Sequence, residues 1–216
     1  MSVRRDTTVL LHGLWTHGAL MQLQRYYLGR LGLDAVCYSY PSVRLTLGQN
    51  AARLAHFARG LGAARVNWVG HSLGGLVILR MLEREPPLPA GRVVLLGVPY
   101  TDSHAGRSLA ASRLGTHALG HSMHEWLAAK KPAGYPGREI GVLAGTLAIG
   151  LGRLVARDLP SPNDGAVALA ETELAGASDR IALPVTHTGM LLSHSVARQT
   201  GVFLQTGKFD HSVPAG

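Results

Sequence analysis

The sequence predicts an α/β protein with a doubly wound, mainly parallel sheet of about six strands. Short uncharged apolar runs, rich in β-branched residues, alternate along the 216-residue chain with longer segments that carry apolar residues at helical spacing. The run at 93–98 is uncharged throughout, as in a strand that is buried on both faces of a parallel sheet. Strands that alternate with helices in this way form a parallel sheet with right-handed crossovers.

The expected elements follow in chain order. We expect strands at 7–11, 35–40, 66–70, 93–98, 140–146 and 180–186, and helices at 17–31, 47–61, 73–85 and 190–204. Pro41 ends the second strand, and Gly29 and Gly32 mark the end of the first helix. No internal repeat or domain boundary is visible, so we predict one domain over residues 1–216.

Residues 101–136 form an insertion between the fourth and fifth strands. Its apolar and Ala-rich pattern predicts one or two helices that form a helical cap over the ligand site, whose expected residues are described below. The insertion holds His117, His121 and His124, whose spacings of four and three residues are compatible with a metal ion. We favour polar histidines on the outer face of a helix, because no cysteine or well-placed carboxylate accompanies them. We therefore expect no metal and no cofactor, although a histidine that faces the pocket could bind substrate.

The composition is that of a compact, soluble chain. Hydrophobic residues make up 46% of the sequence and charged residues 16%, which excludes a disordered protein. The single cysteine, Cys37, excludes an intrachain disulfide. The start of the chain lacks the apolar segment of a signal peptide, and no apolar stretch reaches the roughly 20 residues of a membrane span. We expect a cytoplasmic protein.

The formal net charge is +8, from basic residues that are scattered along the chain. No block of Lys and Arg interleaved with aromatic residues occurs, so we expect no nucleic-acid partner. A positive surface could attract anionic lipid or acidic substrates. A generally arginine-rich composition explains the charge more simply.

The most informative stretch is residues 65–75. An apolar run at 66–69 is followed by Gly70, His71, Ser72, Leu73 and Gly74, and then by apolar residues at helical spacing. A strand, a sharp turn with a central serine and a helix give the G-x-S-x-G pattern its meaning, because the strained turn projects the serine hydroxyl above the sheet. The sequence therefore predicts Ser72 as a nucleophile. The alternative is a glycine-rich turn with an incidental serine.

A second motif lies at the end of the first strand. Gly13 lets the chain turn toward the nucleophile, so that the backbone N–H of Leu14 joins that of Leu73 in a two-donor oxyanion hole. We interpret His12 as a structural side chain that hydrogen-bonds this loop. Trp15 and His17 are expected at the pocket mouth, although Trp15 could instead belong to the core.

The acid should follow the fifth strand, where Asp158 and Asp164 are the candidates. Asp164 lies in a Ser-Pro-Asn-Asp-Gly turn at 161–165 that can present a carboxylate rigidly. Asp158 is explained by pairing with Arg157 or Arg153. We predict Asp164 as the acid; an ordinary Asp-Gly turn is the alternative.

The base should follow the last strand, and His187 has that position. His194 falls inside the final helix and His211 in the C-terminal tail. The chain order is then Ser72, Asp164 and His187, as such hydrolytic triads on α/β sheets require.

Ligands of doubly wound sheets bind beyond the carboxyl ends of the strands. His12, Ser72, Pro99, His187 and the loop after residue 146 all fall at that edge. The pocket is expected to include the following residues: Trp15, His17, His71, Pro99, His121 and Met190.

Four motifs carry a resemblance to a known family. They are Leu-His-Gly-Leu at 11–14, Gly-His-Ser-Leu-Gly-Gly at 70–75, Asn-Asp-Gly-Ala-Val at 163–167 and His-Thr-Gly-Met-Leu-Leu at 187–192. Over nearly its whole length the chain resembles the α/β-hydrolase fold family, in particular small bacterial lipases and esterases and the GPI-inositol-deacylase-like hydrolases. The insertion at 101–136 is a departure, because minimal lipases are shorter there.

The resemblance implies hydrolysis of carboxylic esters, as in an esterase or lipase, by Ser72, His187 and Asp164 through an acyl-enzyme. It identifies neither the acyl chain nor the alcohol. An acyltransferase that uses the same acyl-serine is the first alternative, and a peptidase is a weaker one. A non-catalytic binding module on the same fold is the rival from another class.

Overall fold

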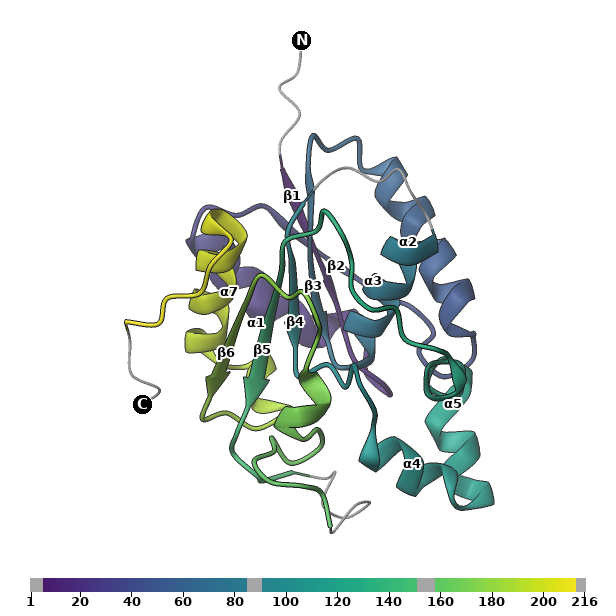
Figure 1. The fold of residues 1–216 in the computed structure, drawn as a ribbon. Helices are drawn as coiled ribbons and strands as arrows, with labels where there is room; N and C mark the ends of the chain where they lie inside the picture. Colours follow the sequence, from purple (N-terminus) through teal and green to yellow (C-terminus); the bar gives the residue numbers. More distant parts are fainter. Residues whose placement is uncertain (1–5, 85–90, 151–157, 213–216) are drawn as a thin grey trace.

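The computed structural model describes residues 6–84, 91–150 and 158–212. Six strands form one sheet in the order β2-β1-β3-β4-β5-β6, and every neighbouring pair is parallel (Figure 1). The strands are β1 (Thr7–Leu11), β2 (Ala35–Tyr38), β3 (Val66–His71), β4 (Val93–Leu96), β5 (Ile140–Gly145) and β6 (Asp179–Leu183). The predicted fold class is confirmed.

Three strands end two or three residues earlier than the sequence pattern indicated, and the residues that follow explain why. β4 ends before Gly97, whose φ of +56° turns the chain out of the sheet. β6 ends before Pro184, which has no N–H to donate to a neighbouring strand. β2 ends at Tyr38, and the chain then turns so that the Tyr40 N–H donates to Nε2 of His12.

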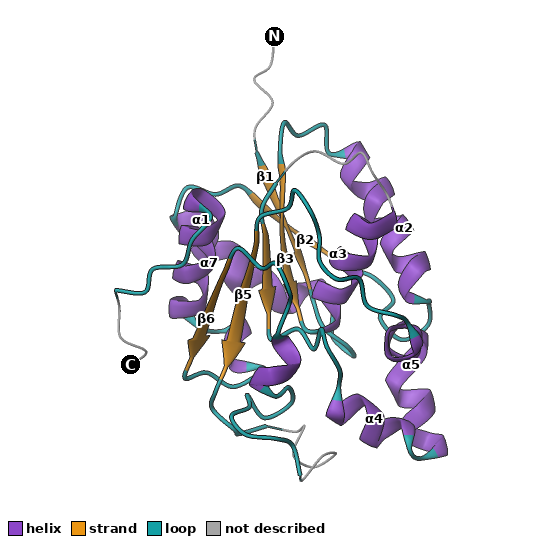
Figure 2. Cartoon of the chain, in the orientation of Figure 1, coloured by secondary structure: helices purple, strands orange, loops and turns teal. Residues whose placement is uncertain are grey.

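Helices cover both faces of the sheet, as Figure 2 shows. The helices α1 (Gln22–Arg30) and α7 (His194–Thr206) lie on one face, and α2 (Leu47–Gly60) and α3 (Leu73–Arg84) lie on the other. Each face has its own apolar core, with Trp68 buried under α2 and α3 and Phe203 of α7 buried on the opposite side. The expected helix at 73–85 ends at Arg84, and Glu85 lies outside the described residues.

Two expected helices are each divided into a 3-10 turn and an α-helix. His17 accepts a hydrogen bond from the Ala19 N–H and so begins η1 (Gly18–Met21), which precedes α1. Similarly, η3 (Gly189–Leu191) precedes α7, because Ser193 accepts from the Val196 N–H and caps a new helix. A third 3-10 turn, η2 (Leu169–Thr172), lies between β5 and β6.

The insertion at 101–136 forms two helices, α4 (His104–Ala110) and α5 (Arg113–Ala128), beside the carboxyl ends of the strands (Figure 1). Serine N-caps begin both helices, since Ser103 accepts from the Gly106 N–H and Ser112 from the Gly115 N–H. α5 is kinked at Gly120, where φ is 72° and ψ is 166°. Beyond the kink, Trp126 is fully buried and joins the core under α2 and α3.

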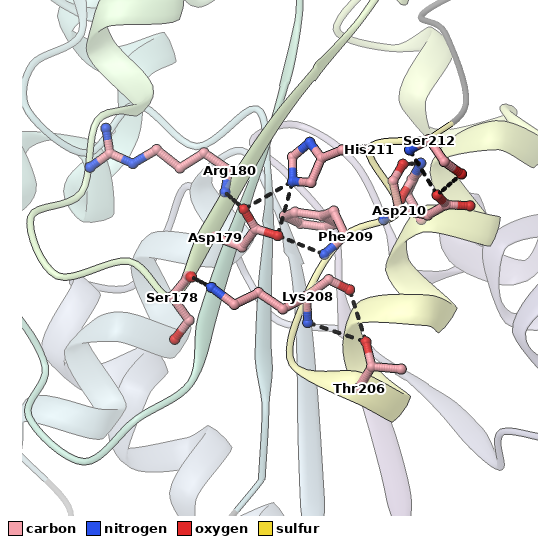
Figure 3. Close-up of polar contacts among 10 residues, drawn as sticks. Ser178, Asp179, Arg180, Thr206, Lys208, Phe209, Asp210, His211 and Ser212 are labelled. Atoms are coloured by element: carbon pink, nitrogen blue, oxygen red, sulfur yellow. Dashed lines mark hydrogen bonds and ion pairs between the residues drawn. The ribbon is translucent and has the colours of Figure 1, made fainter.

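The segment after α7 is held to the start of β6 by one carboxylate, as Figure 3 shows. Asp179 accepts a 2.8 Å hydrogen bond from the Phe209 N–H, and Nε2 of His211 lies 3.1 Å from its carboxylate oxygens. Phe209 then packs on Phe203 in the core. Within the described part of the chain, no helix combines the length and the apolar character that crossing a membrane requires.

Candidate active site

Ser72 occupies the sharp turn between β3 and α3. Its φ is +52°, a left-handed conformation that is uncommon for a residue with a side chain. The turn is held on both sides, because the Ser72 N–H donates to the Leu96 carbonyl (2.9 Å) and the Gly75 N–H donates to the Ser72 carbonyl (3.0 Å). The structure therefore forms the strained strand–turn–helix that the motif predicts.

The two glycines of the motif are required by close backbone approach. A Cβ at Gly70 would lie 2.5 Å from the Cα of Gly75, where α3 begins. A Cβ at Gly74 would lie 2.5 Å from the carbonyl oxygen of His12, at the end of β1. Both contacts would be with backbone atoms that cannot move aside, so larger residues would open the turn.

His187 and Asp164 form a hydrogen-bonded pair. The His187 Nδ1 lies 2.7 Å from Asp164 Oδ2 and donates to it, because a carboxylate can only accept. The other carboxylate oxygen, Oδ1, accepts from the N–H groups of Ala166 (2.9 Å) and Val167 (2.7 Å). Asp164 is 1% exposed and accepts hydrogen bonds at both carboxylate oxygens, so the carboxylate is fixed in one orientation.

The backbone joins the same two residues. The His187 N–H donates to the Asp164 carbonyl at 2.8 Å, and the Asp164 N–H donates to the Val167 carbonyl at 3.1 Å. With Nδ1 donating to the carboxylate, the histidine is in the tautomer that leaves Nε2 as the acceptor.

Asp158 has a different role. Its side chain is 80% exposed, and its Oδ1 lies 3.0 Å from Nε2 of His104 at the start of α4. The predicted partners of Asp158, Arg153 and Arg157, lie outside the described residues.

Ser72 and His187 line one cavity of about 450 Å³ at the carboxyl ends of the strands. Leu14 and Leu73, whose N–H groups were expected to bind an oxyanion, line it as well. Its remaining walls are mostly apolar and come from the segments after β1, β4, β5 and β6 and from α4 and α5. The following apolar residues contribute: Trp15, Leu20, Pro99, Ala105, Leu109, Leu119, Met123, Ala166, Val167 and Leu191.

The loop after β1 approaches the serine closely, since a Cβ at Gly13 would lie 3.2 Å from Ser72 Cβ. The Gly13 carbonyl accepts two hydrogen bonds of 2.9 Å, from His12 Nδ1 and from Thr16 Oγ1. That carbonyl belongs to the peptide unit whose N–H is on Leu14, so both bonds orient the candidate oxyanion donor. Burial lowers the pKa of His12, and the Tyr40 N–H donates to its Nε2, so a neutral ring holds the loop.

Of the six expected pocket residues, Trp15, His71 and Pro99 line the cavity. The other three do not. His17 caps η1 with its ring, and His121 is exposed on α5 just after the kink. Met190 is fully buried in the core beneath the site, where its methyl group would contact a Cβ at Gly97.

His71 lines the cavity, but it is 4% exposed, and its Nε2 lies 2.9 Å from the His187 carbonyl. The two imidazole rings are 4.6 Å apart between centroids. Burial, aided by the nearby His187, lowers the pKa of His71 to about 3. A neutral His71 therefore holds the backbone of the His187 loop, and its side chain exposes too little surface to bind a substrate.

Gly97 is a site residue that sequence reasoning missed. A Cβ there would lie 3.0 Å from Asp164 Oδ2 and 3.1 Å from His187 Nδ1. The only sequence signal is a glycine directly after the fourth strand, which also suits an ordinary strand end.

The three histidines of the insertion do not come together. His117 and His124 bind backbone carbonyls of α5, at Arg113 and Thr116 respectively, both at 2.9 Å. The kink at Gly120 lies between His117 and the other two and breaks the helical spacing on which the metal hypothesis depended. Among residues 6–84, 91–150 and 158–212, no group of three or more His, Cys, Asp or Glu side chains could hold a metal ion.

A family model described as the alpha/beta hydrolase family matches residues 8–207. The chain belongs to this family, which confirms the resemblance seen in its motifs. Membership and fold together support a hydrolase activity. A search of curated proteins found no significant match.

Solved structures of similar fold include esterases and thioesterases. The metagenomic carboxyl esterase MGS0156 is 17% identical with a TM-score of 0.68, and the match covers 95% of this chain and 76% of that one. The RedJ thioesterase of the prodiginine pathway of Streptomyces coelicolor is 13% identical with a TM-score of 0.62, covering 91% and 85%. The thioesterase domain of NocB, from the nocardicin cluster, is 18% identical with a TM-score of 0.53, covering 89% and 90%. At these identities the likeness concerns the fold.

Proposed function

We propose that the protein is a serine hydrolase that cleaves carboxylic esters through Ser72, His187 and Asp164. One observation carries the proposal: a serine in a left-handed turn and a histidine paired with a buried carboxylate line the same cavity. The strained turn presents the hydroxyl, and the carboxylate keeps the histidine in the tautomer of a general base.

In the proposed reaction, Ser72 Oγ attacks the ester carbonyl carbon while His187 Nε2 takes the hydroxyl proton. The Leu14 and Leu73 N–H groups stabilise the oxyanion of the tetrahedral intermediate. When the intermediate collapses, the C–O bond to the alcohol breaks and His187 returns the proton to the leaving alkoxide oxygen. Water then attacks the acyl-serine with His187 again as the base, which releases the carboxylic acid and restores Ser72.

The cavity supports an apolar acyl group as the substrate part that enters it. Its lining is mostly hydrophobic, and 450 Å³ is within the range of small-molecule sites. Trp15 and Leu20 line the cavity and are also 57% and 48% exposed, so the cavity has an apolar rim. Such a rim favours ester substrates carried by lipid assemblies, consistent with a peripheral contact with lipid.

The direct test combines active-site labelling with turnover of p-nitrophenyl esters. Ser72→Ala should abolish labelling by a fluorophosphonate probe and lower the turnover number by at least about 10³-fold. Ser195→Ala, which removes an exposed serine of α7, is the matched control and should retain full activity. If folded wild-type protein is not labelled, the fold serves a binding function instead. Product analysis with an added alcohol separates hydrolysis from acyl transfer.

A further inference from the structure

Trp15 has a backbone conformation that few bulky residues adopt. Among the described residues, only Trp15 and Ser72 have positive φ without being glycine, at 58° and 52°. Each is next in sequence to a proposed oxyanion donor, since Leu14 precedes Trp15 and Leu73 follows Ser72. A left-handed tryptophan is unfavourable by itself and persists only where its surroundings hold it.

One contact across the fold holds Trp15 in place. Its indole Nε1 donates a 2.7 Å hydrogen bond to the carbonyl of Ala118 in α5, 103 residues away in the chain. The side chain is 57% exposed and lines the cavity, so core packing does not fix it. The hydrogen bond ties the loop that carries Leu14 to a helix of the insertion.

The point of attachment on α5 lies beside the cavity. Leu119, the residue after Ala118, lines the cavity, and so does Met123 one turn beyond. Gly120 breaks the helix between them, and the His121 N–H donates to the Val43 carbonyl at 3.0 Å instead of continuing the regular helix. An acyl chain in the cavity would therefore contact the same segment of α5 that receives the indole hydrogen bond.

We propose that Trp15 is a positioning residue, which couples the seating of an acyl chain against α5 to the placement of the Leu14 N–H in the oxyanion hole. This inference rests on the proposed ester hydrolysis. His12 and Thr16 hold the Gly13 carbonyl from within the loop, and Trp15 ties the loop to α5. The length of the acyl chain then affects kcat, because an acyl chain that fills the cavity holds α5 in place and, through Trp15, the loop that carries Leu14.

The test is Trp15→Phe, which keeps an aromatic wall and removes the indole N–H. For wild type we expect kcat to rise with acyl length over p-nitrophenyl esters from acetate to octanoate. In Trp15→Phe that rise should be lost, with kcat for the octanoate about tenfold lower and KM within about twofold, because a misplaced oxyanion donor acts on the transition state. Tyr26→Phe, an equally exposed aromatic residue on α1, is the control and should match wild type.

A second measurement separates the effect of Trp15 on the oxyanion donor from its direct contact with the acyl chain. An octyl trifluoromethyl ketone, which forms an oxyanion on reaction with Ser72, should bind Trp15→Phe about tenfold more weakly. The corresponding octanamide, which forms none, should bind both proteins alike. A raised KM with unchanged kcat, or equal weakening of both ligands, would show that Trp15 only lines the cavity.

The wild-type protein provides a measurement that does not depend on the variant's folding. With ¹⁵N-labelled tryptophan, the indole N–H of Trp15, the one exposed tryptophan of the three, should become slower to exchange with solvent when the ketone binds. Unchanged exchange would overturn the coupling. Fluorophosphonate labelling of wild type separates failure of the proposed hydrolysis from failure of the role of Trp15. Absence of labelling would contradict the proposed hydrolysis. Normal labelling, together with a wild-type dependence of kcat on acyl length in Trp15→Phe, would contradict only the role of Trp15.

Discussion

The side chain of His71 donates from Nε2 to the backbone carbonyl of His187 at 2.9 Å, across 116 residues of sequence. The residue before the candidate nucleophile thereby supports the loop of the candidate base. Burial lowers the pKa of His71 and keeps the ring neutral, so the ring donates as the tautomer that carries its proton on Nε2. Two loops of the candidate site are thus joined by one buried side chain.

Protonation of His71 should therefore make the fold sensitive to acid. Burial lowers the His71 pKa from 6.5 to about 3, so between these values the unfolded chain binds more protons than the folded one. The free energy of unfolding should rise with pH in this window, and fall by up to about 1.4 kcal/mol per unit as the pH drops from about 6.5. His12, whose pKa is also lowered by burial, acts in the same direction.

Urea unfolding of wild type and His71→Gln at pH 7, 6 and 5 measures this. The glutamine amide can still donate to the His187 carbonyl but does not titrate, so the variant should show a shallower pH dependence. His56→Gln, which replaces an exposed histidine on α2, is the control and should keep the wild-type slope. Parallel slopes for all three proteins would contradict a buried neutral His71.

Replacing Asp164 by Asn should impair catalysis, although the two side chains have nearly the same size and geometry. The amide can donate to the histidine, which favours the wrong tautomer, and a loss of about 10⁴-fold in kcat is the expected scale for such a change. Asp158→Asn is the matched control, because Asp158 is exposed and pairs with His104 on the surface. Steady-state ester hydrolysis distinguishes them, and equal losses in both variants would remove Asp164 from the proposed triad.

Gly97→Ala should lower both stability and activity. Its φ of +56° costs a non-glycine residue about 1 kcal/mol, and the added Cβ would press on the Asp164 and His187 side chains at 3.0 and 3.1 Å. Gly62→Ala separates the two effects, because Gly62 has a φ of +60° and open space where a Cβ would be. We expect both variants to lose Tm, with the larger loss in Gly97→Ala, and at least about a tenfold loss of kcat only in Gly97→Ala. Full activity in Gly97→Ala would show that the pair tolerates displacement.

The cavity wall on α4 should limit acyl length. Leu109→Trp adds bulk to a lining residue, so the longest ester that is turned over efficiently should become shorter by several carbons, while acetate turnover stays within about twofold. Leu114→Trp adds the same bulk at a residue that is 87% exposed and outside the lining. A panel of p-nitrophenyl esters measures both, and an unchanged profile for Leu109→Trp would place the acyl group elsewhere.

The strand–turn–helix around Ser72 and the chain order of Ser72, Asp164 and His187 could be predicted from the sequence. These features depend on local periodicity, on glycines where backbones cross, and on the rule that sites lie at the carboxyl ends of parallel strands. Asp164 could also be preferred to Asp158, because a Pro-Asn-Asp-Gly turn presents a carboxylate rigidly.

The supporting contacts could not be predicted in this way. His17 and His121 were expected in the pocket, but a cap on η1 and the kink at Gly120 direct their side chains elsewhere. Met190 was expected there too, yet the 3-10 turn before α7 buries it in the core. Each of these three places is also held by a hydrogen bond to a residue distant in the sequence: Gly18 N–H to Ser39 Oγ, His121 N–H to the Val43 carbonyl, and Gln24 Nε2 to the Met190 carbonyl.

The sequence by itself determined the class of fold, the family and the order of the candidate catalytic residues, because these follow from short-range patterns. Only the tertiary structure decided what holds those residues: His71 under His187, Gly97 beside Asp164, and Trp15 bound to Ala118. Each of these contacts joins segments that are far apart along the chain. Their geometry results from the packing of the whole sheet and its helices, which no local pattern encodes.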